Sequence, residues 1–301
     1  MTWVQAIILG IVEGLTEYLP VSSTGHLILA QRAMGLEGTA ANAYAVCIQA
    51  GAILAVLGIY RERVKQAVVG WAGKIGIGGG DEDGFQLGVN LIAAFLPAAF
   101  LGLAFDDMIE EYLFGLWPIV AAWLIGGLAI LAVVGWKKRN SKDENVGFSL
   151  NHLTWKMALA IGFIQCLAMW PGTSRSLVTI VGGVLMGLSL ASAVEFSFLL
   201  GVITLCAATA YKALEAGPIM VDAYGWTPMI IGSIAAWGSA VLAVKWMVRF
   251  LQEHGMAIFG YYRVILALIV ANVILAGWIS VTPTEDASNG PSDVAPATST
   301  E

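Results

Sequence analysis

Two carboxylates lie close together in an apolar stretch near the start of the sequence. Glu13 and Glu17 are four residues apart, so on a helix they share one face. Each ionised carboxylate at mid-membrane would cost roughly 2.5–3.5 kcal/mol, and two on one face repel each other. The pair is explained if it holds a divalent cation, Mg²⁺ or Ca²⁺, or if one carboxyl takes up a proton. The alternative is two helix-end carboxylates that reach interfacial water.

A polar segment with hydroxyls and a histidine follows these carboxylates directly. In PVSSTGH (20–26), the hydroxyls belong to Ser22, Ser23 and Thr24. His26 lies three residues after Ser23, on the same side if a helix resumes there. An imidazole near hydroxyls and carboxylates is suited to general acid–base or nucleophilic catalysis. The alternative is a histidine that only hydrogen-bonds to the backbone.

A second polar segment, PGTSRS (171–176), is typical of an anion site. Gly172 permits unusual backbone dihedral angles, and the amides of 173–176 would open a helix N-terminus toward an anion. Arg175 adds a charged donor fork that suits phosphate, and Thr179, one turn later, can face the same ligand. Alternatively, Arg175 pairs structurally with one of the two early carboxylates, which would still bring the two polar segments together.

The composition of the chain places these segments in a membrane. Of 301 residues, 58% are hydrophobic and only 12% are charged, and the mean hydropathy is +0.79. Soluble domains are about 25% charged. A soluble globular protein, a disordered chain and a basic nucleic-acid binder are therefore excluded, and the net charge of −6 offers no footprint for nucleic acid. The three cysteines, all in apolar runs, are expected to pack in the core: Cys47, Cys166 and Cys206.

The apolar runs predict an all-α integral membrane protein with about six transmembrane helices. The expected spans are 43–60, 85–105, 113–136, 196–211, 223–244 and 264–284. Lysine and arginine place three connections in the cytoplasm, 61–84, 137–156 and 245–263, whereas the acidic segments expected outside are 106–112 and 212–222. We expect one membrane domain, 1–281, and a disordered polar tail, 282–301.

Because successive spans must end on opposite sides of the membrane, two segments have to enter and leave it on the same side. These segments, 3–30 and 156–191, are apolar arms around the polar centres described above, so we expect two re-entrant helical hairpins. GIVEGL (10–15) aligns with GFIQCL (162–167), and after a one-residue slip Ser23 pairs with Ser174.

Each hairpin precedes three spans, an odd number, which predicts two inverted-topology repeats. The repeats are expected at about 3–136 and 155–281. Inverted repeats with broken helices place their site near the midplane, where the breaks meet. The residue types there predict hydrolysis of a phosphate ester or anhydride on a substrate that resides in the membrane.

A transporter or flippase for a phosphorylated lipid or anion is the alternative from another functional class. The acid–base set argues against it, because binding alone needs no proton transfer. Two polar residues in the spans after the hairpins, Gln49 and Glu195, could either support the site or join helices. Tryptophans near the span ends are expected to form an interfacial belt: Trp117, Trp136, Trp155, Trp226 and Trp278.

Two long motifs resemble the signature regions of the undecaprenyl-diphosphate phosphatase family, also called bacitracin-resistance proteins. They are EGLTEYLPVSSTGHL (13–27) and QCLAMWPGTSRS (165–176). The resemblance runs over roughly 3–280 and includes CIQAGAILAV (47–56), EFSFLL (195–200) and the pair Tyr262-Arg263. It implies hydrolysis of undecaprenyl diphosphate to undecaprenyl phosphate and inorganic phosphate. That reaction recycles the lipid carrier for peptidoglycan and other envelope polymers and confers bacitracin resistance. The implied location is the bacterial inner membrane, with the site facing the periplasm.

The resemblance also implies roles for individual residues. Glu13 and Glu17 resemble the acidic pair linked to a divalent cation, and the expected catalytic residues are Glu17, Ser23, His26 and Arg175. The expected substrate-binding residues are Ser22, Thr24, Gln165, Gly172, Thr173, Ser174, Ser176 and Thr179. The chain departs from many relatives at Leu177-Val178, which affects packing behind the anion site and removes no polar group.

Two mechanisms remain open at this stage. Ser23, deprotonated by His26 or Glu17, would attack the terminal phosphorus, or water would attack directly with His26 as base. Oligomeric state is equally open between a monomer and a homodimer.

Overall fold

In the computed structural model, residues 1–77, 79–139 and 146–279 are described, and every element of two or more turns in them is an α-helix. The first half contains α1 (Trp3–Thr16), α2 (Ser23–Ala33), α3 (Thr39–Ile59), α4 (Arg61–Lys74), α5 (Glu82–Leu113) and α6 (Leu116–Arg139). The second half contains η1 (Leu150–His152), α7 (Trp155–Gln165), η2 (Cys166–Met169), α8 (Arg175–Leu185), α9 (Leu190–Tyr224), α10 (Trp226–His254) and α11 (Ala257–Leu275).

Six of these helices are long and apolar enough to cross a membrane. They are α3, α5 (over Glu82–Phe105), α6, α9, α10 and α11, with mean hydropathies from 1.6 to 2.3. The helices α1, α7 and α8 are apolar but shorter. The predicted all-α, multi-pass membrane fold is therefore confirmed.

Several helices extend beyond the spans predicted from the sequence. The segment 212–222, expected to be an outer loop, lies inside α9, and α10 and α11 leave only two residues of the expected connection 245–263. These predictions were wrong because charged side chains mark where a helix leaves the membrane, not where it stops. Glycines with positive φ end α9, at Gly225 (73°), and α10, at Gly255 (69°).

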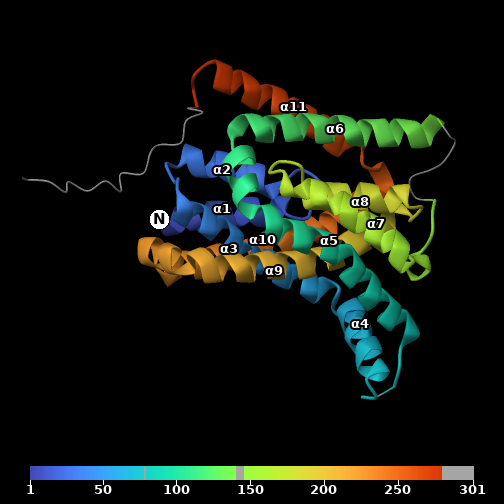
Figure 1. Cartoon of the computed structure of the whole chain (residues 1–301). Helices are drawn as coiled ribbons and strands as arrows, with labels where there is room; N and C mark the ends of the chain where they lie inside the picture. Colours follow the sequence, from blue (N-terminus) through green and yellow to red (C-terminus); the bar gives the residue numbers. More distant parts are fainter. Residues whose placement is uncertain (78, 140–145, 280–301) are drawn as a thin grey trace, which may run out of the picture.

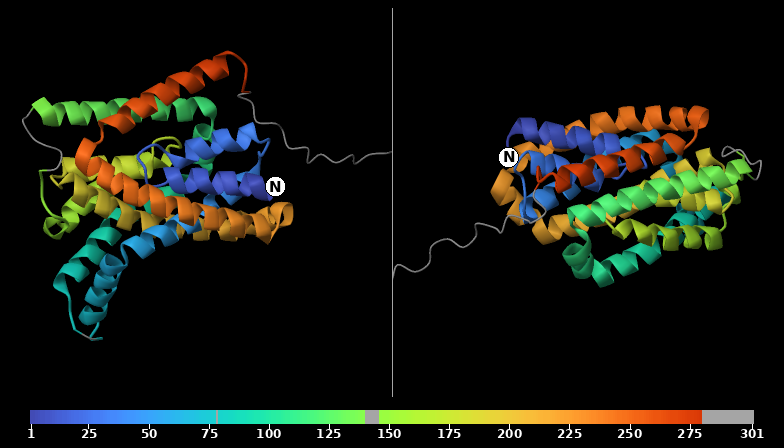
Figure 2. Two further views of the ribbon diagram at one scale, coloured as in Figure 1. Left: turned by 180° about the vertical axis from the view of Figure 1, so that it is seen from behind. Right: turned by 90° about the horizontal axis from the view of Figure 1, so that it is seen from above.

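The other connections are also more helical than expected. Much of 61–84 forms α4, and α5 continues through 106–112, although the acidic side chains of that segment lie outside the described residues. The last span ends at Leu275 rather than at 284, and the predicted tail 282–301 lies outside the described residues. Helix α4 and the first turns of α5 project from the bundle (Figures 1 and 2).

Helices from the two halves pack against each other in matched pairs. Helix α1 packs on α10 and α7 packs on α5, while α3 packs on α9 and α6 on α11 (Figure 1). Helix α9 contributes much of the core, since Phe196, Phe198 and Leu200 are completely buried. The short helices α2 and α8 lie between the layer of α6 and α11 and the remaining long helices (Figures 1 and 2).

Glycines allow the close approach of the short first helices of each half. A Cβ on Gly10 would lie 2.8 Å from the Cβ of Ala235 in α10, and a Cβ on Gly162 would lie 2.5 Å from the carbonyl oxygen of Ala94 in α5. Real Cβ atoms do not approach that closely, so both positions require glycine or a shift of the helices.

The two polar centres share one unusual backbone conformation. Ser22 (φ 74°) and Ser174 (φ 77°) are the non-glycine residues of the described chain with positive φ, and each directly precedes a short helix. They are separated by the same number of residues as Gly10 and Gly162, so no one-residue slip is needed. The predicted pairing of Ser23 with Ser174 was wrong by one position: Ser23 corresponds to Arg175, and each is the first residue of its helix.

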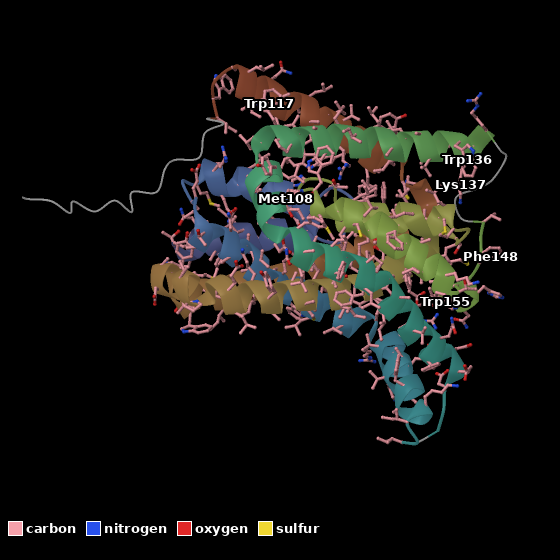
Figure 3. All side chains as sticks on the ribbon, viewed as in Figure 1. Met108, Trp117, Trp136, Lys137, Phe148 and Trp155 are labelled. Carbon is pink, nitrogen blue, oxygen red and sulfur yellow. The ribbon has the colours of Figure 1, made fainter. Side chains whose placement is uncertain are left out.

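Exposed tryptophans lie at the helix ends, as predicted. Figure 3 shows Trp117 and Trp136 toward opposite ends of α6, with Trp155 at the same end as Trp136 and Lys137. Their exposed fractions are 42%, 51% and 50%, respectively.

Candidate active site

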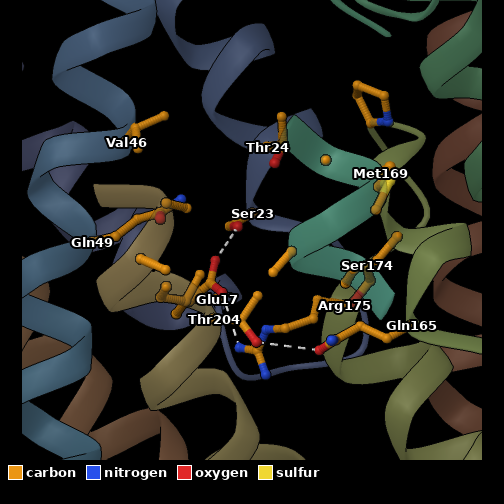
Figure 4. Close-up of a pocket in the computed structure, with 18 of the residues that line it drawn as sticks. Glu17, Ser23, Thr24, Val46, Gln49, Gln165, Met169, Ser174, Arg175 and Thr204 are labelled. Atoms are coloured by element: carbon orange, nitrogen blue, oxygen red, sulfur yellow. Dashed lines mark hydrogen bonds and ion pairs between the residues drawn. The ribbon is translucent and has the colours of Figure 1, made fainter. Parts of the chain in front are cut away.

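The two breaks, 17–22 between α1 and α2 and 170–174 between η2 and α8, border one cavity of about 480 Å³ (Figure 4). Its polar lining includes Glu17, Ser22, Ser23, Thr24, Gln49, Gln165, Ser174 and Arg175. Small and apolar residues of α5 form another wall: Phe95, Ala98, Ala99, Gly102 and Leu103. The cavity therefore joins a compact polar group to an apolar surface.

Glu17 is the residue on which the two breaks converge. The hydroxyl of Ser23 donates to its Oε2 at 2.5 Å, and Nη2 of Arg175 donates to its Oε1 at 3.1 Å (Figure 4). The side chains of Arg175 and Glu17 are 9% and 6% exposed, so this is a buried ion pair. The sequence left open whether Arg175 pairs with one of the two early carboxylates, and it does pair with Glu17. The hydroxyl of Ser23 joins the same carboxylate.

The guanidinium of Arg175 is held from several sides and keeps one free donor. Its Nη1 donates to the carbonyl of Ser197 at 2.9 Å, and the group lies over the Tyr18 ring, 5.5 Å from the centroid. The lack of a side chain at Gly201 leaves room for it. Among the described residues, its buried Nε has no hydrogen-bond partner.

Two helix N-termini open onto the same cavity. Helix α2 begins at Ser23 and α8 at Arg175, and both residues line the cavity. A helix N-terminus carries partial positive charge and free amide donors. Together with the arginine, the two termini favour an anionic group in the cavity.

Glu13 lies one turn before Glu17 and is completely buried. Neither of its carboxylate oxygens has a hydrogen-bond partner within the described chain. An ionised carboxylate in that state is strongly disfavoured unless a cation or a proton balances it. Two carboxylates one turn apart fit a hard divalent cation that completes its shell with water and phosphate oxygens. The described residues contain no cluster of three or more acidic, histidine or cysteine side chains around one point.

His26 points away from the hydroxyl that it was expected to activate. Its Nδ1 contacts the carbonyl of Ser22 at 2.6 Å, and its Nε2 contacts the hydroxyl of Tyr262 at 2.7 Å. The rings of His26 and Tyr262 are stacked, 5.9 Å apart, and His26 is outside the cavity lining. The side chain that the hydroxyl of Ser23 contacts is instead the carboxylate of Glu17.

The expected substrate-binding residues divide into two groups. Those that line the cavity are Ser22, Thr24, Gln165, Gly172 and Ser174. Three others hold the protein together: Ser176 donates to the Leu19 carbonyl at 2.9 Å, Thr179 bonds with Ser197 at 2.6 Å, and the Thr173 amide donates to the Trp170 carbonyl at 3.0 Å. Leu177 and Val178 are themselves buried residues of α8.

Sequence reasoning missed some residues of the site and left others undecided. Gln49 lines the cavity. Glu195 is outside the cavity lining and forms an ion pair with Arg63, with 2.6 Å between its Oε1 and the Nε of Arg63. Arg263, expected in a cytoplasmic connection, is instead completely buried in α11. The available signal was its place in the Tyr262-Arg263 pair, directly before the fully apolar run 264–271.

These observations define a class: a multi-pass helical membrane protein with a buried, anion-accepting polar site reached along an apolar wall. Residues 6–269 match the family described as bacitracin resistance protein BacA. Because the match covers most of the chain, the protein belongs to this family. The family resemblance predicted from the two motifs is thereby confirmed.

Curated proteins from several bacteria are similar over nearly the whole chain. A protein of Sorangium cellulosum named undecaprenyl-diphosphatase is 42% identical over 271 residues, covering 90% of this chain and 86% of its own. Proteins with the same name from Ectopseudomonas mendocina (40%, covering 91% and 93%) and Nitrosomonas eutropha (41%, covering 92% and 99%) are similar to the same extent.

Proposed function

We propose that this protein is an undecaprenyl-diphosphate phosphatase, which releases the terminal phosphate and leaves undecaprenyl phosphate. The observation that carries the proposal is the buried contact of Ser23 and Arg175 with Glu17, at the point where two helix N-termini open onto one cavity. This arrangement combines a hydroxyl nucleophile, a carboxylate base and an anion-binding group. The names of the relatives support the same substrate.

The shape of the cavity supports a lipid diphosphate rather than a soluble one. The diphosphate would lie at the polar end, where Arg175, Ser174 and the N-termini of α2 and α8 offer donors. The prenyl chain would follow the apolar wall of α5, where Ala98 and Gly102 leave space. Next to Gly102, the closest atom to an added Cβ is the Cε of Met169 at 4.0 Å, so this wall is open.

The chemical step follows from the contacts of Ser23. Its proton passes to Glu17 as its Oγ bonds to the terminal phosphorus, and the bridging oxygen leaves with the lipid monophosphate. Next, the oxygen of a water molecule bonds to the phosphorus of the phosphoserine as the Oγ–P bond breaks. Ser23 takes back the proton held by Glu17, Glu17 takes the proton that the water loses and later releases it to solvent, and inorganic phosphate leaves. Arg175 stabilises the negative charge on the equatorial oxygens in both steps. Glu17 fits the role of base better than His26, whose two ring nitrogens are both engaged elsewhere.

The proposal includes a divalent cation, Mg²⁺ or Ca²⁺, which the carboxylates of Glu13 and Glu17 would hold. When bound, it would offset charge on the phosphate oxygens. The unpartnered oxygens of Glu13 support such a ligand role.

We further propose that the two breaks belong to re-entrant hairpins in inverted repeats within a single membrane domain. The matched backbone at Ser22 and Ser174 and the reciprocal packing of α1 on α10 and α7 on α5 support this arrangement. With lysine and arginine on the cytoplasmic side, the site would open toward the periplasm of the inner membrane. A homodimer is also part of the proposal, to be tested by cross-linking in the membrane.

The deciding experiment measures phosphate release from undecaprenyl diphosphate by purified protein, with and without EDTA. We expect release by the wild type, loss of release with EDTA, and loss in Arg175→Ala. The matched control is Arg249→Ala, since the side chain of Arg249 is 82% exposed and is not part of the cavity lining. A folded wild type that releases no phosphate would overturn the proposal and favour a lipid transporter.

A further inference from the structure

One arginine of the last helix bonds to both breaks at once. Nη2 of Arg263 donates to the carbonyl of Gly172 at 2.9 Å, and Nη1 donates to the carbonyl of Pro20 at 3.4 Å. The same Nη2 also donates to the carbonyl of Ala122 in α6 at 2.9 Å. A single planar group therefore joins the first break, the second break and a transmembrane helix.

The surroundings of Arg263 are built to receive its guanidinium. The side chain is completely buried, and Gly126 of α6 provides the space, since a Cβ there would lie 2.9 Å from the Cζ of Arg263. Its three hydrogen bonds within the described chain go to backbone carbonyls, and these bonds are charge-assisted. A buried cation is costly, so its retention needs a function other than packing.

The positions of these carbonyls relate Arg263 to the reacting groups. Pro20 lies two residues before Ser22, and Gly172 lies two residues before Ser174, the two residues with positive φ. The next residues, Ser23 and Arg175, are those that contact Glu17. Arg263 itself is outside the cavity lining, so it acts through the backbone rather than on a ligand.

We propose that Arg263 is a positioning residue, which fixes the two breaks against each other so that Ser23 and Arg175 both reach Glu17. The fork of arginine is required because two of its nitrogens bond to different breaks, whereas the single ammonium of lysine cannot span both. Helix α11 thereby contributes to the site although, among the described helices, it packs chiefly on α6.

A neighbouring contact places a second α11 side chain at the first break. Tyr262 contacts Nε2 of His26, whose Nδ1 contacts the carbonyl of Ser22. The hydroxyl of Ser176 also links the breaks through the Leu19 carbonyl. Arg263 is thus the central member of a small set of contacts, and its loss should loosen the breaks without separating the helices.

The test combines hydrogen–deuterium exchange with kinetics on Arg263→Met, Arg263→Lys and the control Arg249→Met. In Arg263→Met, we expect faster amide exchange in the peptides covering both breaks, 17–24 and 170–177, with α3 and α9 unchanged. Arg263→Lys should give faster exchange in at least one break, and Arg249→Met in neither. Unchanged exchange in both breaks, or a uniform increase over all helices, would overturn the proposal.

The kinetic part rests on the proposed function, whereas the exchange part does not. Displacement of aligned groups by about 1 Å can cost about 100-fold in rate, so kcat of Arg263→Met should fall by about that factor. In a Ser23→Ala background, the same substitution should reduce the residual rate less than about threefold, because the aligned nucleophile is already lost. Full additivity of the two losses would indicate general destabilisation and would contradict a positioning role. If the wild type lacks phosphatase activity, the exchange result alone decides the inference.

Discussion

Glu17 illustrates how much of the site depends on a single carboxylate. It accepts a hydrogen bond from the hydroxyl of Ser23 on one oxygen and from the guanidinium of Arg175 on the other, so the proposed nucleophile and the proposed anion-binding group are aligned through it. Neutralisation by Arg175 permits an ionised carboxylate in a buried setting.

Removal of the Ser23 hydroxyl separates the two mechanisms considered from the sequence. If Ser23 is the nucleophile, Ser23→Ala should lower kcat for phosphate release at least 10²-fold, to well below about a tenth of the wild-type value. Initial rates on undecaprenyl diphosphate measure this, with Ser149→Ala, at the far end of the bundle, as the control serine. A Ser23→Ala enzyme that retains more than about a tenth of kcat would favour direct attack by water.

The direction of His26 shows a limit of residue spacing as a predictor. The sequence correctly predicted that Glu17, the hydroxyls and Arg175 would meet, because charged groups in a membrane need polar partners. Three residues along a helix leave about 60° between side chains, enough for Ser23 to face the cavity and His26 to face α11. The partner Tyr262 is remote in sequence, and local spacing carries no information about it.

At the scale of the helices, positive charge and alternation of sides predicted the arrangement better than they predicted its boundaries. The two broken segments were recognised because the charged connections fix the side of the membrane at each end of a segment. Segments 3–30 and 156–191 were each expected to begin and end on the same side, so neither could be a simple span. The extensions of α9 and α10 were missed because their ends are set by Gly225 and Gly255, whose left-handed backbone is not visible in a count of charges. Arg263 was missed for a related reason: three carbonyls satisfy its charge inside the bundle.

The contact of α1 with α10 should tolerate little added volume. Gly10→Ala places a methyl group against Ala235 and the backbone of α10, so we expect destabilisation of about 1–3 kcal/mol from overpacking. Gly238→Ala on α10 is the matched control, since open space surrounds it and alanine favours the helix by up to about 1 kcal/mol. Thermal unfolding in detergent compares the two; equal melting temperatures would show that α1 can move away at little cost.

At the scale of the whole molecule, one helical bundle holds two breaks with a similar backbone and different side chains. The first carries the acid, the hydroxyls and the histidine, whereas the second carries the arginine and the glycine turn. Ser23 and Arg175 are the first residues of the short helices α2 and α8, so a similar backbone presents a hydroxyl from one side and a cation from the other. Composition and the apolar runs predicted the helical membrane framework. The contacts between the two breaks are made by side chains that only the folded chain brings together.

The proposed orientation predicts which residues an impermeant thiol reagent can reach. In a chain without native cysteines, Thr39→Cys and Asp222→Cys should react in intact bacterial cells, because both lie at the end expected outside. Lys156→Cys, at the start of α7, should react only after permeabilisation. All three positions are exposed. Reaction of Lys156→Cys in intact cells would contradict the orientation and, with it, a second hairpin that enters from the cytoplasmic side and returns to it.

The size of the cavity determines which concentration controls turnover of such a substrate. A volume of about 480 Å³ suits a ligand of ordinary drug size, and a long polyprenyl chain exceeds it. Most of that chain must therefore remain among the acyl chains of the bilayer while only the head group and first isoprene units enter. Substrate then arrives by two-dimensional diffusion, and the rate follows its mole fraction in the membrane rather than its amount per litre. Adding inert detergent to mixed micelles should slow the enzyme by surface dilution, whereas adding buffer at a fixed micelle composition should leave the turnover of micelle-bound enzyme unchanged.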